Sequence, residues 1–387
     1  MTKQEFLSEL RRLTGALTEQ ERARLAEYYS EMIDDRVEEG VPEEEAVAAL
    51  GDPADIAREF ASDGPREASG NRSETVAALR SLRVHVANAD VTVIREDLAS
   101  GAAAQLRFSD PQRFDWRMNG DTLEVLERKL ESGHRGLEFG LRWLKQMITE
   151  PDLQVTIALS QGLSNALDFE GGGSDLKIEG VSFAKAQLRT SSGDVTLNHV
   201  KCEGGIGIDL HTHSGDVKLT DVSAANLMLH AASGDIAIRD LALSGRLRLQ
   251  TASGDIELRD VESDEASITT ASGDIELDRG RTGVTEVRTA SGDVRLVEAE
   301  ADPELQVESA SGDIGLVRCI ARHARVKSVS GDVDLRLEPL PCGYDLLANS
   351  VSGSIHFGDG LTDGNGDPQP KLVVSTVSGD IEAKLAR

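Results

Sequence analysis

The tripeptide Ser-Gly-Asp recurs through the second half of the chain and constrains the fold more than any other feature of the sequence. Nine copies begin at Ser192, Ser214, Ser233, Ser253, Ser272, Ser291, Ser311, Ser330 and Ser378, and Ser352 begins a Ser-Gly-Ser variant. Successive copies are 22, 19, 20, 19, 19, 20, 19, 22 and 26 residues apart. A period this regular predicts a solenoid, in which each unit buries its apolar face only by stacking on its neighbours.

The residues around each tripeptide alternate between apolar and polar, which is the pattern of a β-strand with one buried face. Around Ser272, Ile268 and Thr270 precede the serine, and Ile275 and Leu277 follow it, with polar residues between them. The other copies repeat these residue types, with Thr or Ser filling a narrow corner. The predicted fold class is mainly β: a parallel β-solenoid (β-helix) of about ten rungs of 19–20 residues, with a separate small N-terminal all-α domain.

The aspartates of the tripeptides should form one column, because stacked rungs place equivalent residues about 5 Å apart. In one interpretation the glycine adopts a positive φ in a turn and the aspartate accepts hydrogen bonds from neighbouring backbone N–H groups. In the other interpretation a cation lies among the carboxylates, with Asp255, Asp274 and Asp293 as candidate calcium ligands. The nine-residue repeat of calcium-binding β-rolls is absent, so we favour the turn.

Three histidines form the second candidate metal site. His211 and His230 occupy the same register position on adjacent rungs, and His213 lies two residues from the first. Three imidazoles can bind zinc. However, the position faces outward and holds Gln250 and Arg288 in other rungs, which favours a surface ladder over a metal site.

The first sixty residues predict four short helices. Thr2 with Glu5, and Thr18 with Glu21, are capping-box patterns, and Asp52-Pro53 is typical of a helix start. Tyr28 and Tyr29 lie on the apolar face of the second helix. They are candidate interaction residues, although a tyrosine pair at this spacing more often belongs to the core.

Composition divides the chain into four segments. Residues 1–60 form a four-helix signalling or interaction domain, and 61–75 form a polar, flexible linker. Residues 76–170 form a β-rich N-terminal part of the solenoid, and 171–387 form the Ser-Gly-Asp solenoid itself. The stretch from 361 to 370 is expected to be an insertion between rungs.

Residues 134–150 interrupt the strand pattern with helical spacing of apolar residues. The favoured interpretation is a helix that caps the open end of the solenoid and covers unpaired strand groups. The alternative is an amphipathic segment that touches a membrane surface or a partner, with Trp143 and Met147 as candidate interaction residues.

Composition also excludes several classes of function. The formal net charge of -27 argues against direct nucleic-acid binding, which requires clustered Lys and Arg. Cys202, Cys319 and Cys342 are too far apart in the sequence for a CxxC motif. No nucleophile–base motif, P-loop or dinucleotide fingerprint is present, and aromatic residues are only 3%. We therefore expect no enzyme and no cofactor.

The targeting signals expected of an exported or membrane protein are also missing. The N-terminus lacks the apolar core of a signal peptide. No apolar stretch approaches the roughly 20 residues that span a bilayer. A cytoplasmic location is therefore expected, with peripheral membrane contact as an option.

Two segments resemble known families. Residues 1–60, with KQEFLSEL, EYYSEMIDD and ALGDPADIAREF, resemble the HAAS-type helical signalling domain of Gram-positive bacteria. That resemblance implies a PadR-like transcription regulator as partner and often accompanies membrane spans, which this sequence lacks. Residues 80–387, with the S-G-[DS]-[IV] repeats, resemble the β-strand-repeat family of "putative adhesins" that includes Lia-type envelope-stress proteins. This second resemblance implies an interaction surface and no activity.

Three functional hypotheses follow. The first is a non-catalytic interaction or scaffold protein in bacterial envelope-stress or transcriptional signalling, in which the helical domain docks a regulator and the solenoid is a rigid binding arm. The second is a surface-associated, adhesin-like binder of cationic peptides or other envelope ligands, for which the acidic charge is suited. The third is a carbohydrate-active β-helix enzyme, which the scarcity of aromatic residues disfavours.

Overall fold

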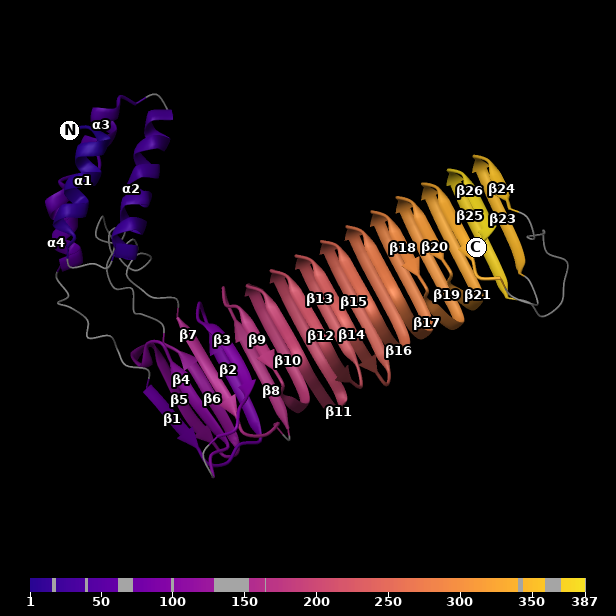
Figure 1. The fold of residues 1–387 in the computed structure, drawn as a ribbon, viewed down its shortest axis with the longest axis horizontal. Coiled ribbons are helices and arrows are strands. Elements are labelled where there is room, and N and C mark those ends of the chain that lie inside the picture. Colours follow the sequence, from indigo (N-terminus) through magenta and orange to yellow (C-terminus); the bar gives the residue numbers. More distant parts are fainter. Residues whose placement is uncertain are drawn as a thin grey trace. The chain divides into compact units, whose positions relative to one another are not determined.

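The computed structural model describes residues 1–15, 19–38, 41–61, 72–98, 101–128, 153–163, 165–339, 344–358 and 370–386. These residues fall into two compact units. The first contains Met1–Arg72, Ser109–Pro111 and Arg128–Leu153, and the second contains Ser73–Phe108, Gln112–Glu127 and Gln154–Arg387. Figure 1 shows the helices in the first unit and the stacked strands in the second.

The helical unit holds four helices in its described part: α1 (Lys3–Leu13), α2 (Glu19–Glu38), α3 (Glu43–Ala48) and α4 (Pro53–Ala61). The capping box predicted at α1 is confirmed, because Glu5 N–H donates to Thr2 Oγ1 (3.2 Å) and Thr2 N–H donates to Glu5 Oε2 (2.9 Å). Asp52 caps α4, accepting from the Ala54 N–H at 2.8 Å. Thr18, the cap predicted for α2, lies outside the described residues.

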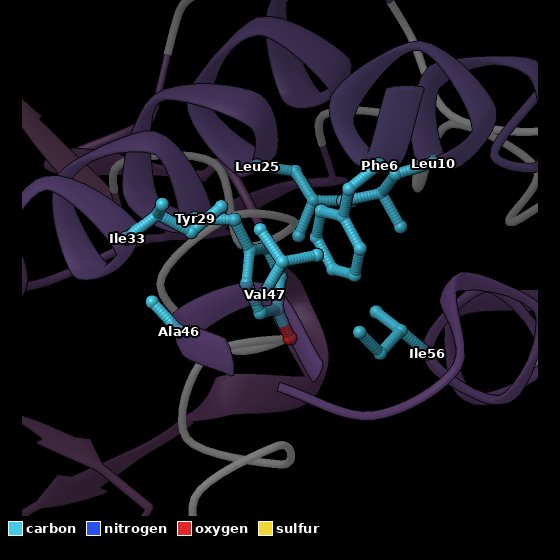
Figure 2. Packing of buried hydrophobic residues seen from close by; sticks show 8 residues of the cluster. All are labelled: Phe6, Leu10, Leu25, Tyr29, Ile33, Ala46, Val47 and Ile56. Atoms are coloured by element: carbon cyan, nitrogen blue, oxygen red, sulfur yellow. The ribbon is translucent and has the colours of Figure 1, made fainter. Parts of the chain in front are cut away.

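One apolar cluster holds the helical unit together, and Figure 2 shows its side chains pointing toward one another. It comprises Phe6, Leu10, Leu25, Tyr29, Ile33, Ala46, Val47 and Ile56. The rings of Phe6 and Tyr29 meet edge to face, with centroids 5.7 Å apart, a geometry that aromatic pairs prefer. Each helix contributes at least one residue, so no helix buries its apolar face without the others.

The second unit is a β-solenoid, as predicted. Its N-terminal strands are β1 (Arg72–Val76), β2 (Ser81–Val86), β3 (Asp90–Arg95), β4 (Ala104–Phe108), β5 (Phe114–Asn119), β6 (Thr122–Glu127), β7 (Gln154–Leu159), β8 (Ala166–Gly171) and β9 (Leu176–Glu179), with a 3-10 helix at Pro111–Arg113. Its central strands are β10 (Ser182–Ser192), β11 (Val195–Ser214), β12 (Val217–Ala224), β13 (Leu227–Ser233), β14 (Ile236–Leu243), β15 (Arg246–Ser253), β16 (Ile256–Ser272) and β17 (Ile275–Ser291). Its C-terminal strands are β18 (Val294–Val297), β19 (Glu300–Ser311), β20 (Ile314–Val317), β21 (Ile320–Ser330), β22 (Val333–Leu337), β23 (Asp345–Ser352), β24 (Ile355–Phe357), β25 (Lys371–Ser378) and β26 (Ile381–Leu385).

Equivalent residues of successive repeats stand directly beside one another in parallel register. Between β16 and β17, Ile256 pairs with Ile275, Val261 with Gly280 and Ile268 with Val287, along three sides of the rung. The predicted inward columns are buried: Ile256, Ile268 and Ile275 are each at most 1% exposed. The predicted polar corner is confirmed as well, since Thr270 is 2% exposed and donates to the Ser272 carbonyl oxygen at 3.2 Å.

A second corner of the rung was not predicted from the sequence. It lies four residues after the first inward residue that follows seven of the nine tripeptides, and its residues adopt φ of 51–56°. They are His199, Asp221, Asp240, Asp260, Arg279, Glu298 and Arg318. Such a φ in non-glycine residues costs conformational energy, and here each is held between two hydrogen-bonded sides of the rung.

The stacking order departs from chain order at both ends of the solenoid. At the C-terminal end, β25 pairs with β21 on one side and with β23 on the other, so in Figure 1 the yellow strands lie between orange ones. At the N-terminal end, β2 lies between β6 and β8, and β4 and β5 add antiparallel pairings to β7 and β6. Ile355 holds in the Ser352 repeat the position that Ile275 holds in the Ser272 repeat, so the repeat pattern predicts that it is buried. It is 38% exposed because its rung is the outermost one.

Two sequence predictions lie outside the described residues. The helix predicted at 134–150 is one, and nearly all of the insertion predicted at 361–370 is the other. Most of the predicted linker, residues 62–71, is also outside them.

Candidate functional site

The aspartate column is a hydrogen-bonded ladder. Oδ1 of each aspartate accepts the backbone N–H of the residue at the same position on the next rung, as from Asp274 to Asp255 (2.8 Å) and from Asp293 to Asp274 (2.7 Å). The ladder begins at Asp90, which the Asp175 N–H reaches at 3.1 Å, and ends at Ser354, whose N–H donates to Asp380 Oδ1 at 2.7 Å. Each carboxylate therefore satisfies a turn N–H, which favours the turn interpretation.

The glycine of the tripeptide is required twice over. Gly273 has φ of 140°, and a Cβ built on it would lie 2.1 Å from the Gly254 carbonyl oxygen of the preceding rung. A methyl group has no room there, and the backbone conformation also disfavours any side chain. The repeat is thus explained by the close stacking of its turns.

The three histidines do not converge on one point. The rings of His211 and His230 stack face to face, 4.9 Å apart and 9° from parallel, so their ring-plane lone pairs run side by side. His211 Nε2 lies 2.9 Å from Asp209 Oδ1, whereas the side chain of His213 is exposed. Burial, followed by the charge of His211, lowers the pKa of His230. In the part of the chain that the structure describes, no three His, Cys, Asp or Glu side chains are grouped to hold a metal ion.

Of the other candidate residues, the structure describes the positions of some and not of others. Tyr29 is 4% exposed and belongs to the helical core. The side chain of Tyr28, and the whole of Trp143 and Met147, lie outside the described residues. Cys202 and Cys319 are buried, and burial raises the pKa of both thiols, that of Cys319 to about 11. A thiolate nucleophile at either position is therefore unfavourable.

The outer faces of the central rungs carry arginines that bridge carboxylates across rungs. Arg279 donates to Asp260 from Nε (2.7 Å) and from Nη2 (2.8 Å). This pairing lowers the pKa of Asp260. Arg281 pairs with Glu262 and Glu300 on the two flanking rungs. Single exposed pairs contribute little to stability. Their effect is to neutralise this surface locally.

One outer surface near the C-terminal end combines exposed cations with exposed apolar side chains, and it was not predicted from the sequence. We call it the basic apolar surface: Arg325, Lys327, Val329, Lys371 and Val377, on the adjacent strands β21 and β25. All five are exposed, with Val329 at 45% and Val377 at 48%. Among the described residues no carboxylate forms an ion pair with Arg325, Lys327 or Lys371. Two carboxylates stand in register with these cations. Glu308 beside Lys327 is bound to Arg288 at 3.2 Å, and Asp345 stands beside Lys371.

Cations without an ion pair to any described residue, next to exposed valines in a chain with a net charge of -27, form a surface suited to an acidic and apolar partner. A sequence signal existed: the position before the tripeptide serine is Ala in Ala252, Ala271 and Ala290, but Val in Val329 and Val377. The sequence alone does not show that Val329 and Val377 lie side by side, because this depends on the stacking order of the last rungs. Among the described helices, none combines the length and apolarity needed to cross a membrane.

Stacked parallel rungs with in-register repeats define this chain as a β-solenoid repeat protein. The Toastrack DUF4097 family model matches residues 79–250 and 240–384, which together are most of the chain, so the chain belongs to that family. The HAAS model matches residues 5–59, within the helical unit. Both resemblances noted in the sequence are thereby confirmed.

Several solved structures are similar to the chain at low identity. A "putative adhesin" from Bacteroides fragilis NCTC 9343 is 12% identical, with 81% of this chain and 95% of that chain covered and a TM-score of 0.30. A "putative lipid binding protein" from Parabacteroides distasonis ATCC 8503 is 13% identical, with 81% and 98% covered and a TM-score of 0.34. A "putative cell adhesion protein" from Clostridium sporogenes ATCC 15579 is 9% identical, with 81% and 98% covered and a TM-score of 0.18. No curated protein matches the sequence.

Proposed function

We propose that this protein is a non-catalytic interaction protein of bacterial envelope-stress or transcriptional signalling. In this proposal the helical unit docks a regulator of the PadR-like type, and the solenoid is a rigid arm that presents a second binding surface. The observation that carries the proposal is the basic apolar surface, where three cations lie beside the exposed Val329 and Val377. By contrast, Arg279, Arg281 and Arg288 on the central rungs are paired across rungs.

The rigidity of the arm follows from its construction. Each central rung is tied to the next by the strand ladder on its sides and by the aspartate ladder at its turn. Binding to a preorganised surface costs less conformational entropy than binding to a loop. A solenoid built in this way can hold a binding surface in a fixed geometry.

The test is affinity capture from the native cell, followed by mass spectrometry. Full-length protein is compared with a version lacking residues 1–64, and with a triple variant Arg325→Glu, Lys327→Glu, Lys371→Glu. We expect the truncation to lose the regulator and the triple variant to lose a different partner. Arg248→Glu is the matched control, because Arg248 is exposed and stands five residues before its tripeptide serine, as Arg325 does. Identical captured proteins in all samples would refute the proposal.

The alternative, an adhesin-like binder of cationic peptides, is favoured by the net charge of -27. Cell fractionation separates the two functions. Protein recovered at the outer surface of intact cells, together with unchanged capture by the triple variant, would support the adhesin-like function.

A further inference from the structure

Among the described strands, the rung formed by β23 and β24 is the last in the stack, and none of them pairs with its outer edge. β23 pairs with β25 and β24 pairs with β26, and no other described strand pairs with either. An edge strand presents alternate backbone N–H and C=O groups to whatever lies beyond it. This edge is therefore a template for one more strand.

The open rung lacks the protection that natural edge strands usually have. Between Asp345 and Phe357 the only ionisable side chains are those of Asp345 and His356, and no proline is present. Four apolar side chains are exposed: Leu347 (47%), Val351 (82%), Ile355 (38%) and Phe357 (39%). Charges or prolines normally prevent edge-to-edge association, so an edge with one carboxylate and four exposed apolar side chains indicates an edge that is used for contact.

The aspartate ladder indicates what cannot continue the stack. On every inner rung of the repeat the carboxylate provides the acceptor for the next rung, but the last rung has Ser354 in that position. A following rung of the same polarity would find no carboxylate for its turn N–H. The other end of the solenoid is also unsuited to this edge, because there β5 pairs antiparallel with β6, and β4, which also pairs with β1, is antiparallel to β7, so the parallel register of the rungs is not continued. Head-to-tail stacking of copies is thus disfavoured.

We propose that two copies of this chain pair through this rung across a two-fold axis, with β23 of one copy antiparallel to β23 of the other. A two-fold contact brings each surface against itself, so it requires a self-complementary surface. A nearly uncharged, apolar edge meets that requirement, whereas acidic surfaces of a chain with charge -27 repel one another. The exposed cations Lys371 and Lys327, one and two rungs away, reduce that repulsion further.

The size of the contact sets its strength. The described part of the rung, Tyr344–Gly358, has 15 residues, against about 20–30 residues a side in a standard stable interface. The dimer should therefore be weak and depend on concentration. It would place two basic apolar surfaces on either side of the junction.

The test is sedimentation velocity on the full-length chain from about 1 to about 200 µM. We expect a monomer–dimer equilibrium across this range for the wild type, shifted at least about tenfold toward monomer by Val351→Lys. Ala271→Lys is the matched control, because Ala271 is exposed and precedes the tripeptide serine of an inner rung. A wild type that stays monomeric at the highest concentration overturns the proposal, and so does an equal effect of the two lysines.

A second variant guards against misfolding. Ser354→Asp restores the residue found on the inner rungs, so it should leave the thermal unfolding of the solenoid unchanged. It would also bring carboxylates toward each other across the two-fold axis and should weaken the dimer. Dimerisation unaffected by both Val351→Lys and Ser354→Asp would mean that any self-association uses another surface. This experiment needs no other partner, so its failure is distinct from a failure of the proposed signalling function.

Discussion

The helical unit and the solenoid are stabilised in opposite ways. The helical unit relies on one cluster to which all four helices contribute, centred on the contact between Phe6 and Tyr29. The solenoid has no centre: Ile275 packs in a column of equivalents, and its rung is bonded to the rungs before and after it. The difference teaches that damage should spread through the whole helical unit, whereas in the solenoid it should be confined to neighbouring rungs.

The largest expected effect is on the helical unit. Phe6→Ala removes a fully buried ring from the only cluster described there, and the expected loss is about 3–5 kcal/mol of unfolding free energy. A small domain has little stability to spare, so hydrogen exchange should show all four helices unprotected and the solenoid unchanged. Val37→Ala, at a site 41% exposed, is the control. If protection were lost only in α1, the single-cluster description would be wrong.

The next largest effect should be local to the solenoid. Gly273→Ala introduces a Cβ 2.1 Å from the Gly254 carbonyl oxygen at a φ of 140°, and should cost at least about 2–3 kcal/mol. Hydrogen exchange should show loss of protection centred on β16 and β17. Gly315→Ala is the control, since its nearest neighbour is 4.0 Å away and its φ is not in the left-handed region. Equal destabilisation by the two alanines would contradict the close-stacking explanation.

A smaller effect is expected from a single ladder carboxylate. Asp274→Ala leaves the Asp293 N–H, now bonded at 2.7 Å, without its acceptor, and should cost about 1 kcal/mol in urea unfolding. Asp274→Asn keeps an oxygen in the same place and should recover most of that loss. A further measurement is calcium titration of the wild type by calorimetry. Saturable binding that Asp274→Asn abolishes would revive the cation interpretation.

The smallest effect is a change in pH dependence. Burial, and then His211, lower the pKa of His230 in the folded chain, so the unfolded chain binds a proton more readily. The corresponding stability is present above the ordinary histidine pKa of about 6.5. It is lost as the pH falls through that value toward the lowered one. His230→Gln places on this rung the residue type found at Gln250 on the next. It should make the thermal midpoint depend less on pH between about pH 5.5 and 7.5. An unchanged slope would show that His230 is not responsible.

What the sequence could predict was set by periodicity. Ile275, Leu277 and Thr270 recur with their neighbours at fixed offsets, so their burial follows from stacking alone. The left-handed corner could not be found in this way. Asp260 is of a residue type enriched at positive φ, but Arg279 and Glu298 at the same position are not, so the column as a whole carries no uniform signal. The positive φ at this corner is imposed by the two hydrogen-bonded strand segments that flank it.

The stacking order of the rungs at the ends of the solenoid could not be predicted from the repeat pattern either. A repeat tells how rungs stack, but not that β25 lies between β21 and β23. The exposure of Ile355, the basic apolar surface and the open edge all depend on that order. The candidate site therefore became visible only with the structure.

The inserted C-terminal strands bear on how the molecule would respond to a mechanical load. In a solenoid stacked in chain order, a pull on the terminus unzips one rung after another at low force. Here β25 and β26 are hydrogen-bonded to rungs on both sides, so a pull on the C-terminus must shear two interfaces at once. The C-terminal strands are thus held between two rungs, although they come last in the chain. They should resist extension until both interfaces give way together.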